Sequence, residues 1–99
     1  MIQVIVFYTL KETFQAIFAE AFNIIRKQVL EEEGCLQYEL FVSPNKPIRF
    51  CLVEKWMSQE ALDKHLKTKH LSDFRLQSEP WYQQKPVIEI KTIENERYL

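Results

Sequence analysis

Three polar side chains of this 99-residue chain have the types and spacing to move a proton. Glu54 alternates with Phe50 and Leu52 in an apolar segment. Its carboxylate therefore either leans into water at a strand edge or is buried, which is costly without a partner. His65 borders an apolar helical stripe and is either a hydrogen-bonded residue at the core edge or a catalytic imidazole. With Tyr38, these groups could hold a proton donor and a proton acceptor near neutral pH.

The alternating segments predict a β-hairpin that brings Tyr38 opposite Glu54. Residues 35–42 and residues 48–56 alternate along the chain, and a five-residue turn with two prolines joins them. A register that pairs Tyr38 with Glu54 keeps the apolar faces of both strands on the same side of the sheet. The phenol and the carboxylate are therefore expected to be neighbours.

A helix after the hairpin is expected to carry His65 over Glu54. Ser58 is a typical N-cap residue, and the helix that it begins spans roughly residues 59–69. This helix must fold back across the strand that precedes it. The carboxylate would then orient the imidazole and raise its pKa, and the phenol of Tyr38 would donate a hydrogen bond to a developing oxyanion.

The rest of the chain supplies two more strands and a longer helix. Residues 2–10 are rich in β-branched and aromatic side chains, which favours a strand, and residues 86–94 form a last strand. Apolar side chains recur every three or four positions over residues 12–32, and Gly34, the only glycine, is a natural helix stop. Residues 71–85 are the least periodic and predict a short helix and a coil.

The order strand, helix, strand, strand, helix, strand predicts a ferredoxin-like α+β fold over one domain, residues 1–99. In this βαββαβ arrangement an antiparallel four-stranded sheet carries both helices on one face. The opposite face would leave Phe41, Cys51 and Val53 uncovered, and a second copy of the sheet is the simplest cover. We therefore expect a homodimer that forms through the sheet faces.

Composition and charge argue against several classes of function. The formal net charge is −1 and no run of Lys and Arg occurs, so nothing supports nucleic-acid binding. The apolar run at residues 4–8 is too short to span a membrane and lacks the features of a signal peptide, so a cytoplasmic protein is expected. The single glycine argues against a phosphate-binding loop, and Cys35 and Cys51 are expected to be reduced thiols.

The spacing of the two histidines argues against a metal site. His65 and His70 would lie about 140° apart on one helix, and the sequence offers no evident third ligand. His70 follows the expected helix end, where a cation suits the helix dipole, so a surface role is one interpretation. A place at the mouth of the cleft beside His65 is the other. No metal is therefore predicted.

The stretch over residues 31–74 resembles a known family. The segments EEEGCLQYELF and RFCLVEKWMSQEALDKHLKTKHLSDF are similar to the antibiotic biosynthesis monooxygenase domain, including its small stand-alone quinol monooxygenase-like members. The family pattern is an acidic-Gly-Cys stretch, a Tyr, a hairpin that ends in Glu-x-Trp, and a His followed five residues later by a second His before a Phe. Its positions here are Gly34, Cys35, Tyr38, Glu54, Trp56, His65, His70 and Phe74.

The resemblance implies a dimeric α/β barrel and a reaction. Two sheets would face each other, and a small electron-rich aromatic, such as a quinol or an anthrone, would be oxidised by molecular oxygen without metal or flavin. Glu54 and His65 would form the base that deprotonates a phenol, and Tyr38 would hydrogen-bond the anion. The residues expected to bind the substrate are Leu52, Trp56, Leu62, His70 and Phe74.

The family also contains haem-degrading members, which the sequence does not favour. Those proteins use an Asn on the first strand and a Trp on the second helix. The first strand here has no Asn, and His65 stands at the place of the Trp. No haem or other cofactor is therefore expected.

Two other functions would use the same residues. An isomerase of a small phosphorylated carbonyl compound would need a cationic anchor, for which Lys69, His70 and Arg75 are the nearby candidates. A non-catalytic dimeric module would bind a small ligand in the same dent. The substrate itself is not predicted, because the fold of residues 70–85 sets the size of the pocket.

Overall fold

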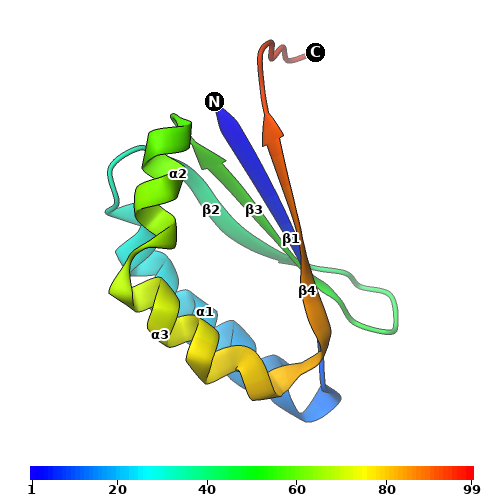
Figure 1. Ribbon diagram of the computed structural model, residues 1–99. Coiled ribbons are helices and arrows are strands. Elements are labelled where there is room, and N and C mark those ends of the chain that lie inside the picture. The colour runs from blue at the N-terminus through cyan, green and yellow to red at the C-terminus, as the bar shows by residue number, and fades with distance from the viewer.

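Four antiparallel strands and three α-helices make up the structure, a computed structural model that describes residues 1–99 (Figure 1). The strands lie in the order β2-β3-β1-β4, and the helices cover one face of the sheet. This is the ferredoxin-like α+β arrangement predicted from the sequence, with a third helix where a short one was expected. The elements are β1 (Ile2–Leu10), α1 (Gln15–Leu30), β2 (Cys35–Val42), β3 (Phe50–Trp56), α2 (Gln59–Leu66), α3 (Lys69–Ser78) and β4 (Tyr82–Thr92).

The core lies between the sheet and the helices. Side chains of a strand alternate between its two faces, so every second residue of β1 points toward the helices. The apolar stripe of α1 packs against this face. Each fully buried Val, Leu or Phe stabilises the fold by roughly 1.5–3 kcal/mol. The buried residues of β1 and α1 are Ile2, Val4, Val6, Tyr8, Leu10, Phe18, Phe22, Ile25 and Val29.

The β2–β3 hairpin has the register that the sequence predicts. Tyr38 pairs with Glu54, and Glu54 is buried on the same face as Leu52. One irregularity, between Cys35 and Gln37, lies at the far end of the hairpin. Both cysteines of the chain are free thiols. The hairpin therefore brings the phenol and the carboxylate side by side, as expected.

The region after the hairpin differs from the prediction. The sequence predicts a helix over residues 59–69 and a short helix after it, whereas α2 already ends at Leu66 and α3 begins at Lys69. Ser58 caps α2 as predicted, and Thr68 caps α3 by accepting a hydrogen bond from the backbone N–H of Leu71. The Thr68 hydroxyl also donates to the carbonyl of His65 at 2.8 Å. One threonine therefore ties the end of α2 to the start of α3.

The segment over residues 71–85, expected to be a short helix and a coil, contains most of α3 and the start of β4. α3 takes up much of residues 71–85, because Leu71, Phe74 and Ser78 recur on one face and are buried. β4 begins at Tyr82, earlier than the predicted start at residue 86. Residues 71–85 therefore lie mostly in regular secondary structure, in α3 and β4.

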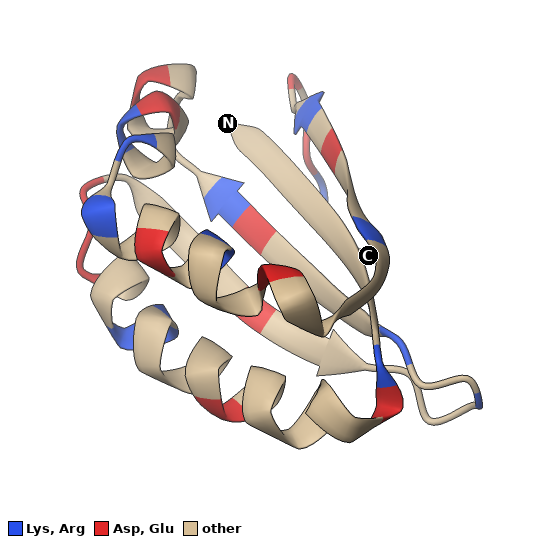
Figure 2. Cartoon of the chain, turned by 60° about the horizontal axis from the view of Figure 1, so that its bottom comes forward, with Lys and Arg blue, Asp and Glu red and all other residues tan.

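The surface combines charges of both signs with one uncovered sheet face. Figure 2 shows Lys and Arg interspersed with Asp and Glu over helices and strands, in keeping with the formal net charge of −1. None of the helices has the length and apolar character needed to cross a bilayer. The sheet face that turns away from the helices has no cover within the chain.

Candidate functional site

A cavity of about 780 Å³ lies between the sheet and helices α2 and α3. Of its 18 lining residues 12 are hydrophobic, so it suits a largely apolar ligand. Tyr38, Glu54 and His65 all line it, so the three predicted catalytic residues lie together. Of the residues predicted to bind a substrate, Leu52, Leu62 and Phe74 line the cavity, whereas Trp56 and His70 do not.

Glu54 is buried on β3 rather than solvated at a strand edge, with 5% of its surface exposed. Its Oε1 accepts a hydrogen bond from the indole N–H of Trp56 at 2.9 Å. Burial raises the pKa of the carboxyl from 4.5 to about 7, and the bond from Trp56 acts in the opposite direction. A carboxyl with this pKa can accept and release a proton near neutral pH.

Trp56 supports Glu54 instead of lining the cavity. Its side chain is fully buried, and its one ring N–H is used by the carboxylate. The indole also packs against the ring of His65, with 4.5 Å between ring centroids. The structure therefore places Trp56 behind the two acid–base groups and not on the cavity wall, where a contact with the substrate was expected.

His65 is almost fully buried on α2, with 2% of its surface exposed. Its Nε2 lies 3.9 Å from Oε1 of Glu54, while its Nδ1 lies 3.0 Å from Oε2 of Glu32. The carboxylate that orients the imidazole is therefore Glu32, and the prediction that Glu54 does so is wrong. Burial lowers the pKa of His65 and outweighs the opposing effect of Glu32, so the predicted rise is also wrong.

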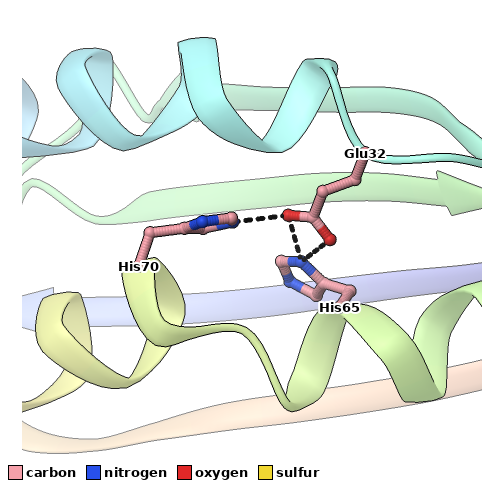
Figure 3. Close-up of side chains that lie close together, drawn as sticks. All are labelled: Glu32, His65 and His70. Atoms are coloured by element: carbon pink, nitrogen blue, oxygen red, sulfur yellow. Dashed lines mark hydrogen bonds and ion pairs between the residues drawn. The ribbon is translucent and has the colours of Figure 1, made fainter.

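Glu32 is the site residue that sequence reasoning missed. It follows α1 and directs its carboxylate between the two histidines (Figure 3). The sequence carries one signal for it, an acidic run at the C-terminal end of a helix, which the helix dipole disfavours. That signal marks a run of three glutamates but does not single out the one that turns inward.

His70 lies in the first turn of α3, not beyond the end of a longer helix. Its Nε2 is 2.7 Å from Oε2 of Glu32, and its side chain lines a separate groove of about 430 Å³ between α1 and α3. The expected place at the mouth of the cleft beside His65 is therefore wrong. The expected angle of about 140° between the two histidines on one helix is also wrong, because they lie on two different helices. Both imidazoles reach the same carboxylate, that of Glu32.

Glu32, His65 and His70 together offer a donor set that a transition metal accepts. One ligand atom from each residue lies within 4.8 Å of the others, so the expectation that no third ligand is available is wrong. The same atoms already satisfy one another by hydrogen bonds, and no buried side-chain nitrogen or oxygen lacks a partner. The cluster is thus complete as a hydrogen-bonded network.

Three tyrosines line the cavity, and two of them are buried, Tyr38 on β2 and Tyr8 on β1. Burial raises the pKa of both phenols well above the ordinary value of 10, so both remain protonated donors. The Tyr38 ring stacks on Phe22, with 5.4 Å between centroids, and Arg26 donates to the Tyr38 carbonyl. Sequence reasoning missed Tyr8, although the alternation of β1 indicates its face.

Comparison with known proteins places this chain in a family. The family described as antibiotic biosynthesis monooxygenase matches residues 1–76, which is most of the chain. The chain belongs to the antibiotic biosynthesis monooxygenase family. The match confirms the resemblance over residues 31–74 and extends it to the first strand and helix. A search of curated proteins gave no significant match.

Three solved structures resemble this family member along nearly its whole length. An antibiotic biosynthesis monooxygenase family protein from Nitrosomonas europaea is 23% identical, with 96% of this chain and 100% of the other covered and a TM-score of 0.89. One from Caulobacter crescentus is 26% identical, with 94% and 90% covered and a TM-score of 0.87. Rv0793 from Mycobacterium tuberculosis is 20% identical, with 98% of each chain covered and a TM-score of 0.90. These likenesses confirm the ferredoxin-like α+β fold.

The histidines and aromatic residues of the family pattern divide into two groups in this antibiotic biosynthesis monooxygenase family member. Tyr38, His65 and Phe74 line the cavity together with Glu54. Trp56 and His70 lie outside it and hydrogen-bond the two carboxylates of the site. The second group therefore orients groups of the network and does not contact the contents of the cavity.

Proposed function

We propose that the chain is a cofactor-independent monooxygenase that oxidises a small electron-rich aromatic, of the quinol or anthrone type, with molecular oxygen. The observation that carries the proposal is that Glu54 and His65 face each other in one largely apolar cavity that also contains the buried phenols of Tyr8 and Tyr38. Family membership supports the reaction class. The side chains of the cavity supply the acid–base chemistry.

The first step is removal of a proton from a hydroxyl of the substrate. The facing atoms of Glu54 and His65 are 3.9 Å apart, so one hydroxyl can contact both. The resulting anion reduces oxygen directly, and the hydroxyl of Tyr38 stabilises the developing oxyanion. One oxygen atom enters the substrate, and the other leaves as water with the two hydrogens that the substrate loses. The substrate supplies all the electrons, so no external reductant is needed.

Activity is expected to rise as the pH increases through about 7. Burial raises the pKa of Glu54 to about 7, and below that pH the protonated carboxyl cannot accept the proton of the substrate. The measurement is kcat/KM for oxygen uptake between about pH 5 and pH 9. A profile that is flat or falls over this range would contradict the assignment of Glu54. The titratable and charged groups around Glu54 are Tyr8, Glu32, Tyr38, His65 and Arg75, and its hydrogen-bond donor is Trp56.

Oxygen uptake with a panel of hydroquinones, catechols, naphthoquinols and anthrones tests the proposal. We expect saturable uptake with at least one compound by protein treated with a metal chelator, above the autoxidation seen with heat-denatured protein. Uptake no faster than autoxidation with every compound would overturn the proposed reaction. Saturable binding of the same compounds without turnover would favour the non-catalytic binding module instead.

An isomerase of a small phosphorylated carbonyl compound is the second candidate. Arg75 and Lys85 line the cavity and would attract a phosphate group. The other predicted anchors, Lys69 and His70, do not line it and are bound to Asp73 and to Glu32. The same acid–base pair would then move a proton without consuming oxygen. Turnover of sugar phosphates under nitrogen distinguishes this reaction from the oxygenase.

We further propose that two copies pair through the uncovered sheet face. The strand register aligns Phe41, Cys51, Phe7 and Val87 in one row across all four strands. The row points away from the helices, and its three large apolar side chains are exposed. A second sheet would remove this apolar row from water.

Phe41→Asp is expected to convert the dimer to a monomer, because a carboxylate between two apposed sheets is buried without a partner. Phe41 is 49% exposed in the single chain, so the substitution does not disturb the core. Leu76→Asp is the matched control, since Leu76 is 69% exposed on α3, away from this face. Light scattering after size exclusion measures the mass. A monomeric wild type, or dissociation by both variants alike, would contradict the proposal.

A further inference from the structure

We propose that Glu32, anchored by His70, is a positioning residue that fixes His65 in the tautomer whose Nε2 accepts a proton in the cavity. The network starts in the cavity at Glu54 and ends at His70 in the groove between α1 and α3. The catalytic meaning of this inference rests on the proposed function. The tautomer itself can be measured in the free protein, whatever the substrate is.

The hydrogen positions follow from the chemistry of the carboxylate. Oε2 of Glu32 lies 3.0 Å from Nδ1 of His65 and 2.7 Å from Nε2 of His70. A carboxylate accepts hydrogen bonds and donates none, so both of these ring nitrogens carry hydrogen. A neutral imidazole has one N–H and one lone pair. The lone pair of neutral His65 is therefore on Nε2.

The position of this lone pair determines the direction of proton transfer. Nε2 is the atom of His65 that faces Glu54, at 3.9 Å. With its lone pair there, His65 accepts a proton from a substrate hydroxyl. In the opposite tautomer Nε2–H would point at Glu54, and the cavity would lose one of its two proton acceptors. Once His65 is protonated, the adjacent carboxylate of Glu32 also stabilises the imidazolium.

Of the catalytic groups Glu32 contacts only His65, although its charge also helps to raise the pKa of Glu54. It does not line the cavity, whereas His65 does. Its carboxylate has both oxygens within 3.1 Å of the imidazole Nδ1, so the orientation of the ring does not depend on one atom. Glu32 is therefore a positioning residue and not a catalytic one.

His70 holds the carboxylate in this orientation. Glu32 lies in the turn after α1, and its side chain crosses to a histidine on each of two other helices (Figure 3). The short bond from His70 fixes Oε2 from the side opposite the cavity. The break in the helix at Thr68 permits this bond, because it puts His70 in the first turn of α3.

Two-bond proton–nitrogen NMR of the uniformly 15N-labelled free protein at neutral pH measures the tautomer of His65. We expect protonated Nδ1 and unprotonated Nε2 in the wild type. Glu32→Ala is expected to shift His65 toward the Nε2–H form, whereas Glu32→Gln, whose amide oxygen still accepts from Nδ1–H, restores much of the Nδ1–H form. Glu33→Ala is the matched control, because Glu33 is the exposed neighbour in the same turn.

Several results would overturn the proposal. The Nε2–H form in the wild type would do so without any variant, and so would a tautomer that Glu32→Ala leaves unchanged. Zn²⁺ is also added to the labelled wild-type protein, and one equivalent is expected to leave the ring nitrogen signals of both histidines unchanged. Stoichiometric changes in both rings would instead identify the cluster as an ion site.

Activity supplies an independent readout with any substrate found by oxygen uptake. Glu32→Ala is expected to lower kcat about 10- to 100-fold, the range known for loss of a carboxylate that orients a metal-bound histidine, with little change in KM. Glu32→Gln is expected to recover part of the loss, and an unchanged kcat in Glu32→Ala would overturn the positioning role. If the wild type consumes no oxygen, the proposed function fails, while the NMR result still decides the tautomer.

Discussion

Replacing Glu54 with Gln is expected to lower kcat/KM for oxygen uptake by about 100- to 10,000-fold, the range typical for loss of a general base. Gln keeps the shape of the side chain, and its amide oxygen can still accept the N–H of Trp56, as the carboxylate does. It cannot take up the proton of the substrate, however. Glu60→Gln is the matched control, because Glu60 is exposed on the same helix as His65. Equal activity of the two variants would remove Glu54 from the mechanism.

The stability of Glu54→Gln separates loss of chemistry from loss of fold. Burial raises the pKa of Glu54 from 4.5 to about 7, so the folded state binds this proton more tightly than the unfolded chain. That contribution to the free energy of unfolding is present below about pH 4.5 and is lost as the pH rises to about 7. A neutral Gln avoids the loss, so at about pH 8 the variant is expected to be more stable by about 3 kcal/mol. A variant that is less stable in urea at that pH would contradict the burial argument.

Replacing Gly34 with Ala is expected to lower the free energy of unfolding by about 2–4 kcal/mol. Gly34 has a φ of +82°, a conformation that costs a residue with a Cβ roughly 1–2 kcal/mol. The added Cβ would also lie 2.6 Å from the Cβ of Ala61 on α2, which forces the helix away from the turn. Because α2 carries His65, the shift also moves the imidazole relative to Glu54.

A double-mutant cycle separates the two causes. Ala61→Gly removes the atom that the new Cβ meets, so the double variant is expected to be more stable than the sum of the single changes by about 1–3 kcal/mol. Ala61→Gly alone costs about 1 kcal/mol, as glycine does inside a helix. Urea unfolding of the three variants provides the numbers. Additive effects would show that the contact with Ala61 contributes nothing.

Much of the cavity was predictable because it is built on a hairpin. A strand has a period of two residues, so the alternation around Tyr38 and Glu54 determines both the buried face and the register that keeps it continuous. The helix after Ser58 then has one way to return across β3, and this brings His65 over Glu54. Local patterns and chain connectivity were sufficient for these three residues.

Glu32 and His70 could not be placed in the same way. Their contact depends on where one helix stops and another starts, and one capping threonine decides this. The signal was present, because Thr68 precedes Leu71, Phe74 and Ser78 at helical spacing. The charged run around it obscured that period. The polar partners of a buried histidine come from such tertiary contacts, which have no sequence period of their own.

Trp56 illustrates the other limit of pattern reasoning. Its place on the same strand face as Glu54 was correctly predicted, and it is buried there. The strand face on which a residue lies does not show whether that residue lines the cavity or packs behind its wall. Its hydrogen bond to Glu54 and its contact with the ring of His65 show that the indole belongs to the packing behind the cavity.

The fate of labelled oxygen tests the proposed monooxygenase reaction most directly. Chelator-treated protein is incubated under 18O₂ with the best substrate of the uptake panel, and the product is analysed by mass spectrometry. We expect one labelled atom in the product and the other in water, with labelling at the uncatalysed level in His65→Ala. A product without label, release of the label as hydrogen peroxide, or equal labelling by His65→Ala would contradict the proposed reaction.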